Sequence, residues 1–247
     1  MNYDKLEHSY WEMQSKRVAD EYSQIKLRAN VSHGSAVPEN DDLALGDGRR
    51  LKAAILFLDI SSFSTRHIET ELEQNSMLHA FNLFFSELIK IAEDYGGTVE
   101  KNTGDGLMAY FEDDGGSPKE GGCKRAVACA QTIFAANEKL INPILEANNM
   151  KPFVFRISIS YGFVTIARIG APGRFMQYVA IGSEANFSAK MLRKASPNEI
   201  VIGESVKNEL PLAWQKSYIK IMLDSNGVIY KDSVIPYNLY TYTGRWV

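Results

Sequence analysis

The sequence predicts an α+β fold, a ferredoxin-like βαββαβ core with additional C-terminal strands. An apolar run that ends on Asp59 predicts the first strand, and a long amphipathic segment that stops at the glycine pair 96–97 predicts the first helix. Two short strand-like segments then flank Gly-Asp-Gly at 104–106, and a second helix and long strands follow. This order of elements is the layered pattern of a ferredoxin-like sheet covered by helices.

The segment before the first strand predicts an extension and a linker. Residues 3–28 carry a modest helical stripe of apolar side chains, and residues 31–50 are rich in Gly, Asp, Asn and Ser, which predicts a loop. We therefore expect an N-terminal helical extension and linker at 1–50 and one main domain at 51–247.

Each core element follows from a local pattern. Residues 52–59 predict a strand, and a helix of about 20 residues runs to the glycine pair that ends it. The segments "TVEKNT" and "LMAYF" predict a hairpin with a two-residue Asp-Gly turn. Ser117 as N-cap and Pro118 in the first turn predict the start of the next helix. The later segments predict, in order, a pair of long strands in "PFVFRISISYGFVTIARIG", a strand, glycine turn and helix in "QYVAIGSEANFSAKMLRKA", and strands in "YIKIMLD", "GVIYKD" and "NLYTYT".

Composition and charge limit the classes of function. The chain has 247 residues, of which 45% are hydrophobic and 23% charged, as in soluble globular proteins. A formal net charge of −3 offers no general field for nucleic acid or an anionic membrane. No apolar run approaches the roughly 18 residues of a membrane helix, and the charged N-terminus does not resemble a signal peptide. We expect a cytoplasmic protein with no nucleic-acid or membrane partner.

Two cysteines, Cys123 and Cys129, lie in one predicted helix on different faces. Neither belongs to a Cys-x-x-Cys motif, so a zinc site is not expected. They predict buried free thiols in a reducing compartment.

Asp59 and Asp105 are the candidate metal ligands. Asp59 ends the first strand and Asp105 lies at the hairpin tip, and a ferredoxin-like sheet places that strand beside that hairpin. Two carboxylates with the backbone carbonyl of Ile60 suit Mg²⁺ or Mn²⁺, and two such ions can serve phosphoryl transfer. The chain through Phe63 and Ser64 turns into the helix, where backbone N–H groups can cradle phosphate oxygens. Singly, Gly-Asp-Gly is commonly a tight turn and a strand-ending Asp a helix cap or salt bridge, but their combination is specific.

Segments along the main domain resemble the class III nucleotidyl cyclase catalytic domain, the family of adenylate and guanylate cyclases. "FLDISSFS" resembles the family's first metal motif, and "FNLFFSELIKIAEDYGGTVEKNTGDGLMAYF" resembles its helix, double glycine, hairpin and second metal Asp. "QYVAIGSEANFSAKM" resembles its Tyr-x-x-x-Gly-x-x-x-Asn-x-x-x-Arg segment, and "YKDSVIPYNLYTY" resembles the late strand pair that carries a phosphate-binding Lys.

The resemblance implies a reaction and a division of labour. Two divalent metal ions, Mg²⁺ or Mn²⁺, would serve attack of the ribose 3′-hydroxyl on the α-phosphorus of a nucleoside triphosphate, which gives a 3′,5′-cyclic nucleotide and pyrophosphate. The family's sites lie between two head-to-tail domains, which implies a homodimer with composite sites. Asn186 would orient the ribose, and Lys231 would hold the terminal phosphates. One protomer would supply the metal ligands Asp59 and Asp105, and the other Lys101, Val179, Asn186, Lys190 and Lys231.

Two positions depart from the purine cyclases. The family's transition-state Arg is Lys190 here, so either its ammonium takes over that role or another cation, Arg174 or Arg168, does. Lys101 matches the first base-reading position of adenylate cyclases, but Val179 stands at the second and can neither donate nor accept a hydrogen bond.

With these departures the chain resembles the bacterial pyrimidine cyclases of Pycsar anti-phage systems, which switch on a companion effector through cyclic UMP or cyclic CMP. The resemblance implies UTP or CTP as substrate. An adenylate cyclase and a catalytically silent nucleotide-binding module stay open as alternatives. An RNA-binding ferredoxin-like domain is disfavoured by the negative charge and by the lack of an aromatic RNA-binding motif.

Overall fold

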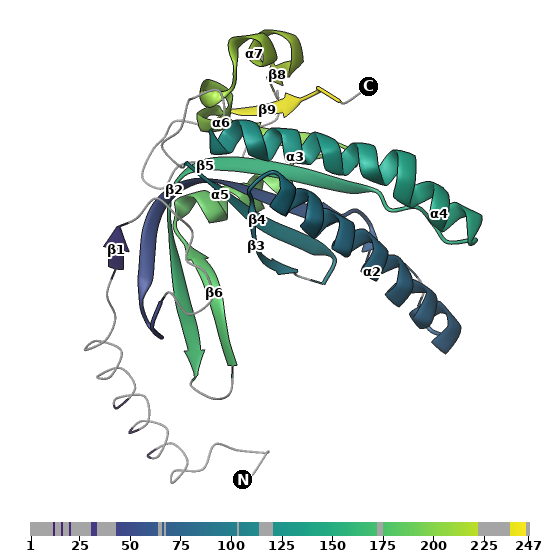
Figure 1. Ribbon diagram of the computed structural model, residues 1–247, viewed down its shortest axis with the longest axis horizontal. Helices are drawn as coiled ribbons and strands as arrows, with labels where there is room; N and C mark the ends of the chain where they lie inside the picture. The colour runs from purple at the N-terminus through teal and green to yellow at the C-terminus, as the bar shows by residue number, and fades with distance from the viewer. Residues whose placement is uncertain are drawn as a thin grey trace.

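The computed structural model describes residues 12, 16, 20, 31–33, 43–63, 66, 68–102, 104–113, 121–171, 175–221 and 238–245. Nine strands form one sheet within this part of the chain, and helices cover both of its faces (Figure 1). The strands are β1 (Val31–His33), β2 (Gly48–Ile60), β3 (Thr98–Asn102), β4 (Gly106–Glu112), β5 (Phe155–Ala171), β6 (Phe175–Ile181), β7 (Ile200–Gly203), β8 (Ile219–Ile221) and β9 (Leu239–Tyr242). The helices are α2 (Glu71–Asp94), α3 (Gly122–Ala136), the π-helix η2 (Asn137–Ile141), α4 (Asn142–Ala147), α5 (Ser183–Leu192), α6 (Glu204–Glu209) and α7 (Leu212–Tyr218).

The ferredoxin-like core is confirmed. Its elements follow each other as β2, α2, β3, β4, α3 and β5, and its strands lie side by side in the order β3-β4-β2-β5. Two of the predicted C-terminal strands are confirmed, since "YIKIMLD" contains β8 and "NLYTYT" contains β9, and both continue the same sheet beyond β7. The third, "GVIYKD", lies outside the described residues. In the core β2 is central, paired with β4 on one side and β5 on the other, and its last residues lie at an end of the sheet.

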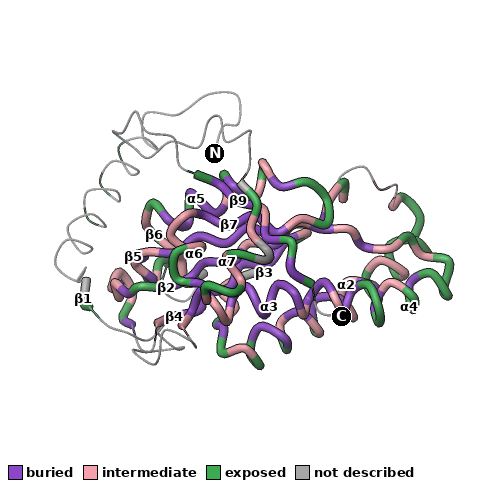
Figure 2. Tube along the Cα trace, turned by 90° about the horizontal axis from the view of Figure 1, so that it is seen from above, coloured by how far each residue is buried: buried purple, intermediate pink, exposed green. Residues whose placement is uncertain are grey.

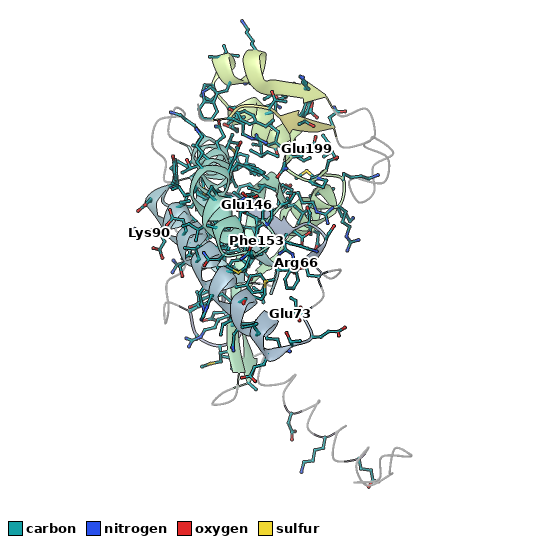
Figure 3. All side chains as sticks on the ribbon, turned by 90° about the vertical axis from the view of Figure 1, so that its right-hand side faces the viewer. Arg66, Glu73, Lys90, Glu146, Phe153 and Glu199 are labelled. Carbon is teal, nitrogen blue, oxygen red and sulfur yellow. The ribbon has the colours of Figure 1, made fainter. Side chains whose placement is uncertain are left out.

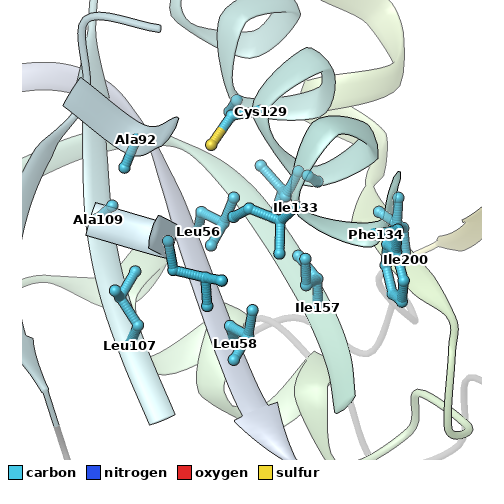
Figure 4. Close-up of a cluster of buried hydrophobic side chains, with 14 of the residues drawn as sticks. Leu56, Leu58, Ala92, Leu107, Ala109, Cys129, Ile133, Phe134, Ile157 and Ile200 are labelled. Carbon is cyan, nitrogen blue, oxygen red and sulfur yellow. The ribbon is translucent and has the colours of Figure 1, made fainter. Parts of the chain in front are cut away.

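Helices α2 and α3 cover one face of the core sheet because their apolar sides pack against it and are thereby removed from solvent. Helix α2 begins with a capping box between Thr70 and Glu73, and its chain turns away at Gly96, whose φ of +67° suits glycine. Figure 4 shows the packing of this layer, in which Leu56 and Leu58 of β2 meet Ile133 of α3. Figure 2 shows the contrast between the buried length of α3 and the exposed start of α2.

Several local predictions need correction because tertiary contacts decide them. The expected pair of long strands at 152–170 is one 17-residue strand, β5, and Gly162 within it makes room for the side chain of Glu184 instead of a turn. The expected two-residue hairpin turn is wrong, since residues 103–105 separate β3 from β4. The predicted loop 31–50 contains β1 and the start of β2, whose Gly48 pairs with Ala167 of β5.

Other predictions fall outside the described residues. Ser117 and Pro118 are among these, and the described helix α3 begins at Gly122. Of the predicted helix 3–28 the structure describes Glu12, Lys16 and Asp20, each helical. The strand β7 and the helices α6 and α7 had no counterpart in the sequence analysis.

Both cysteines are free and buried, as predicted. Among the described helices none is long and apolar enough to cross a bilayer.

Candidate active site

Asp59 and Asp105 meet where β2 ends and β4 begins. Asp59 stands opposite Gly106 in the antiparallel ladder, and the N–H of Ile60 donates to the carbonyl of Asp105 at 2.9 Å. Side chains alternate along β2, so Asp59 lies on the sheet face opposite α2 and α3, while Leu58 and Ile60 are buried beneath those helices. The two carboxylate residues, 46 positions apart in the sequence, thus become neighbours at one end of the sheet.

Arg156, the second residue of β5, is the partner of Asp59 and was missed by the sequence analysis. Its Nη2 and Nε atoms both donate to Oδ2 of Asp59, at 2.9 and 3.1 Å, and its Nη1 donates to the carbonyl of Ala195 at 3.4 Å. Both side chains are about three-quarters buried, with 29% and 27% exposure. The signal that could have found it is a single cation inside the apolar segment "PFVFRISIS", because a half-buried strand position rarely carries an unpaired charge.

The loop after β2 is anchored to the segment that leads into β5. The N–H of Ser61 donates to the carbonyl of Val154 at 2.8 Å, and the guanidinium of Arg66 donates to the carbonyls of Lys151 and Pro152 at 3.2 and 2.7 Å. Phe63 is half-buried in this loop, its ring centroid 5.0 Å from that of Phe81. Its side chain therefore packs towards α2, and only its backbone is suited to the predicted phosphate contact. Ser64 lies outside the described residues.

Helix α5 packs on the other face of the sheet through small polar residues. Ser158 and Ser160 of β5 donate to the carbonyls of Ser188 and Glu184, at 2.7 and 2.8 Å, and the Ser188 hydroxyl donates to the carbonyl of Ile55 at 3.1 Å. Hydroxyls of this size let the helix backbone approach the strands, and each of the three serine hydroxyls is itself hydrogen-bonded. The inward side of α5 is thereby fixed against β2 and β5.

The outward side of α5 carries the predicted catalytic pair. Asn186 and Lys190 are exposed, and their i, i+4 spacing puts them on one face of the helix. The ammonium of Lys190 lies 5.8 Å from the ring centroid of Phe187. Neither side chain has a hydrogen bond to Asp59 or Asp105 within the described part of the chain. Within the described residues, the two predicted halves of the site therefore make no direct hydrogen bond to each other, although α5 packs on the sheet face to which Asp59 belongs.

The remaining predicted residues lie on other strands. Lys101 belongs to the strand β3, next to β4, and the structure describes its backbone but not its side chain. Val179, half-buried on β6, pairs with Ala167 of β5. The alternative cation Arg168 donates to the carbonyl of Leu43 at 2.9 Å and so ties down the start of the domain. The other two residues, Lys231 and Arg174, lie outside the described residues.

The donor set fits a divalent metal that is held jointly with a substrate. Within the described residues no group of three or more His, Cys, Asp or Glu side chains gathers, so no all-protein metal cage forms there. Mg²⁺ is commonly bound by one or two carboxylates together with substrate phosphates. Asp59 and Asp105 supply such a pair, and Asp59 retains solvent access.

The chain matches a known protein family and is similar to two curated proteins. The family described as "Adenylate and Guanylate cyclase catalytic domain" matches residues 48–237. Among curated relatives, a cytidylate cyclase of Staphylococcus aureus is 25% identical over 176 residues, which cover 70% of this chain and 40% of that protein. A uridylate cyclase of Rhodovulum sp. (strain MB263) is 25% identical over 169 residues, 66% of this chain and 67% of that protein.

The fold is shared with solved structures. The adenylyl cyclase CyaB from P. aeruginosa superposes with a TM-score of 0.64 at 26% identity, covering 81% of this chain and 97% of that one. The chain spans less than half the length of its Staphylococcus relative and nearly the full length of this catalytic structure. With a family match over most of its length and the same fold, the chain belongs to the adenylate and guanylate cyclase catalytic domain family.

Proposed function

We propose that this chain is a nucleotidyl cyclase that converts a pyrimidine nucleoside triphosphate, UTP or CTP, to its 3′,5′-cyclic monophosphate and pyrophosphate. The observation that carries the proposal is the meeting of Asp59 and Asp105 at the end of β2. In the reaction the O3′–Pα bond forms, the bond from Pα to the β-phosphate oxygen breaks, and the 3′-hydroxyl proton leaves to solvent.

Asp59 and Asp105 would hold two divalent ions, Mg²⁺ or Mn²⁺. Bound there, such ions supply positive charge to the ribose 3′-oxygen and to the triphosphate. The backbone carbonyl of Ile60, the residue after Asp59, would add a further oxygen ligand.

Arg156 neutralises Asp59 in the free protein, where no metal ion is bound, and would bind the triphosphate in the complex. Its guanidinium neutralises the half-buried carboxylate of Asp59, which would otherwise be desolvated without a partner. A planar fork of N–H donors suits phosphate oxygens as well as a carboxylate. Substrate and metal ions together would therefore separate the pair, the ions taking Asp59 and the triphosphate taking Arg156.

The site is completed by a second copy of the chain. The outward placement of Asn186 and Lys190 on α5 leaves both free of the packing contacts that fix this helix. In a homodimer, Asn186 of one protomer would orient the ribose and Lys190 would stabilise charge on the reacting phosphate, opposite Asp59 and Asp105 of its partner. Lys231 would hold the terminal phosphates.

The pyrimidine preference rests on the base-reading positions and on the two relatives. Val179 offers no hydrogen bond, so a purine site would lose one of its two readers, while Lys101 can donate to a pyrimidine carbonyl. The relatives from Staphylococcus aureus and Rhodovulum carry the names cytidylate cyclase and uridylate cyclase.

The test is incubation of the purified chain with ATP, GTP, CTP and UTP separately, first with Mn²⁺ and then with Mg²⁺, and identification of the products by mass. Cyclic UMP or cyclic CMP is the expected product, and Asp59→Asn should abolish it. Cyclic AMP alone would establish the adenylate cyclase alternative. No product from any of the four would favour the silent nucleotide-binding module, which equilibrium binding of Mn²⁺ and UTP would then reveal.

We further propose that the cyclic pyrimidine nucleotide is a second messenger in anti-phage defence, read by a companion effector. This part rests on the resemblance to the Pycsar cyclases. Cells that carry the gene with its neighbours should resist phage infection and accumulate the cyclic nucleotide, and cells with Asp59→Asn should do neither.

A further inference from the structure

A cavity of about 390 Å³ lies outside the candidate active site, between the start of α2 and the segment that joins α4 to β5. Its walls come from Arg66 and Ile68 of the loop after β2, from the first turns of α2, and from residues 148–151. This volume falls at the lower end of the range of small-molecule pockets, about 300–1,000 Å³.

One side of the cavity is apolar. Ile68, Leu72, Met77 and Met150 contribute it, and Leu72 is 77% exposed at the rim. Covering this exposed leucine with a ligand would contribute about 25 cal/mol of binding free energy for each Å² of apolar surface that is buried. The wall can thus hold the apolar body of a small molecule.

The lining also includes two cations, Arg66 and Lys151. Within the described residues, no carboxylate forms an ion pair with Arg66 or Lys151. The Arg66 guanidinium donates to two neutral carbonyls and lies 5.0 Å from the ring centroid of Phe153. Both residues are labelled in Figure 3. Burial lowers the pKa of Arg66, which reflects a cation taken partly out of water without a counter-charge. Within the described residues, two of its five N–H donors are used.

The carboxylate that also lines the cavity is already engaged. Oε2 of Glu73 accepts from the N–H and the hydroxyl of Thr70, both at 2.9 Å, and from the N–H of Glu69 at 3.1 Å. Its charge is therefore committed to the start of α2, and the lining holds two cations against this one engaged carboxylate.

We infer that this cavity binds a small organic anion, with an apolar or aromatic body against α2 and a carboxylate, sulfonate or phosphate group on Arg66 and Lys151. Its walls continue directly into the site. Arg66 and Ser61 tie the loop after Asp59 to residues 151–154, which lead into Arg156. An occupant thus touches the segments that carry both members of the Asp59–Arg156 pair.

The test uses a matched pair of fluorescent probes on the full chain. One is 8-anilinonaphthalene-1-sulfonate, and the other is N-phenyl-1-naphthylamine, which has the same aromatic body without the sulfonate. We expect one sulfonate probe to bind per chain, with an affinity roughly tenfold above that of the neutral probe. Lys151→Gln should lower the affinity for the sulfonate probe roughly fivefold and leave the affinity for the neutral probe unchanged. The control variant Lys139→Gln, at an exposed lysine of η2, should change neither affinity.

A second pair of variants locates the probe. Ser76→Trp fills the cavity from α2 and should lower the affinity for both probes by more than about tenfold. Ser86→Trp, at an exposed position of the same helix, should leave both affinities unchanged. Circular dichroism and thermal unfolding establish that each variant is folded.

Three outcomes would overturn the inference. The first is unchanged binding of the probes to the Ser76→Trp variant. The second is equal affinity for both probes together with no effect of Lys151→Gln. The third is displacement of the sulfonate probe by UTP with Mn²⁺, which would place that probe in the candidate active site. Because the readout is binding, the result does not depend on whether the chain turns over any nucleotide.

Discussion

Asp59 and Arg156 are paired across the central strands, with Nη2 and Nε of the arginine at 2.9 and 3.1 Å from the same carboxylate oxygen, Oδ2. The residues face each other because β2 and β5 run antiparallel in a register that sets Asp59 opposite Arg156. The proposed metal ligand is therefore already neutralised in the free protein. Any divalent ion that binds Asp59 competes with a guanidinium.

Replacement of Arg156 should separate metal binding from turnover. Arg156→Gln removes the competitor, so we expect Mn²⁺ to bind the free chain several-fold more tightly by electron paramagnetic resonance titration. Turnover of the triphosphate should fall by about 10²-fold or more, because a charged donor to the reacting phosphates is lost. Arg156→Lys keeps the charge without the fork and should be intermediate in both assays. Weaker Mn²⁺ binding by Arg156→Gln would instead show that the arginine positions the carboxylate.

Mixing two inactive variants should restore part of the activity if the sites are shared between protomers. Asp59→Asn and Lys190→Ala damage opposite halves of a composite site. After unfolding and refolding of a 1:1 mixture, half of the dimers are mixed and each holds one intact site, so about a quarter of the wild-type activity should return. Refolding each variant alone is the control. A mixture as inactive as its components would place both residues in a site within one chain.

Val179 should control the choice of base. Val179→Asp adds a hydrogen-bond acceptor next to the base, so the ratio of cyclic AMP to cyclic pyrimidine nucleotide should rise by roughly tenfold or more in competition between ATP and UTP. Val179→Ile changes size without adding a polar group and should leave that ratio within about twofold. An equal effect of both variants would attribute the preference to shape.

Gly162 should be intolerant of even one methyl group. A Cβ there would lie 2.8 Å from Cγ of the buried side chain of Glu184, so Gly162→Ala must displace that side chain and disturb the packing of α5 on β5. We expect a loss of about 1–3 kcal/mol in the free energy of unfolding by urea, and lower turnover because α5 carries Asn186 and Lys190. Phe163→Tyr, at the exposed next position, should cost little. An unchanged urea midpoint for Gly162→Ala would contradict the close packing of α5.

The two thiols should be unreactive in the folded protein. Burial raises the pKa of Cys129 to about 12, and burial, with a smaller contribution from Asp113, raises that of Cys123. A raised pKa keeps the thiol protonated, so at pH 8 the reactive thiolate is scarce, and its fraction grows only as the pH rises towards 12. Labelling by 5,5′-dithiobis(2-nitrobenzoate) at pH 8 should be slow in buffer and reach two equivalents in urea. Rapid labelling in buffer would mean that α3 opens readily.

The order of the core elements could be predicted because each has a local signal. Periodicity marks β2 and α2, and the glycine pair at 96–97 ends the helix since a left-handed residue suits glycine. The convergence of Asp59 and Asp105 also followed, because the βαββαβ order leaves their strands adjacent. The strand boundaries that depend on pairing with another strand could not be predicted from the sequence. Gly48–Arg50 extend β2 because β1 and β5 pair with them, and the expected pair of long strands is one strand, β5, whose Gly162 accommodates Glu184.

The sequence by itself determined the family, the fold class and the identity of the two carboxylates, since local periodicity and spaced motifs encode them. Only the tertiary structure decided what those carboxylates face. The register between β2 and β5 joins Arg156 to Asp59 over 97 positions of sequence. The small hydroxyls beneath α5 fix the inward side of this helix and leave Asn186 and Lys190 exposed. Both relationships depend on contacts between distant segments, which no local pattern records.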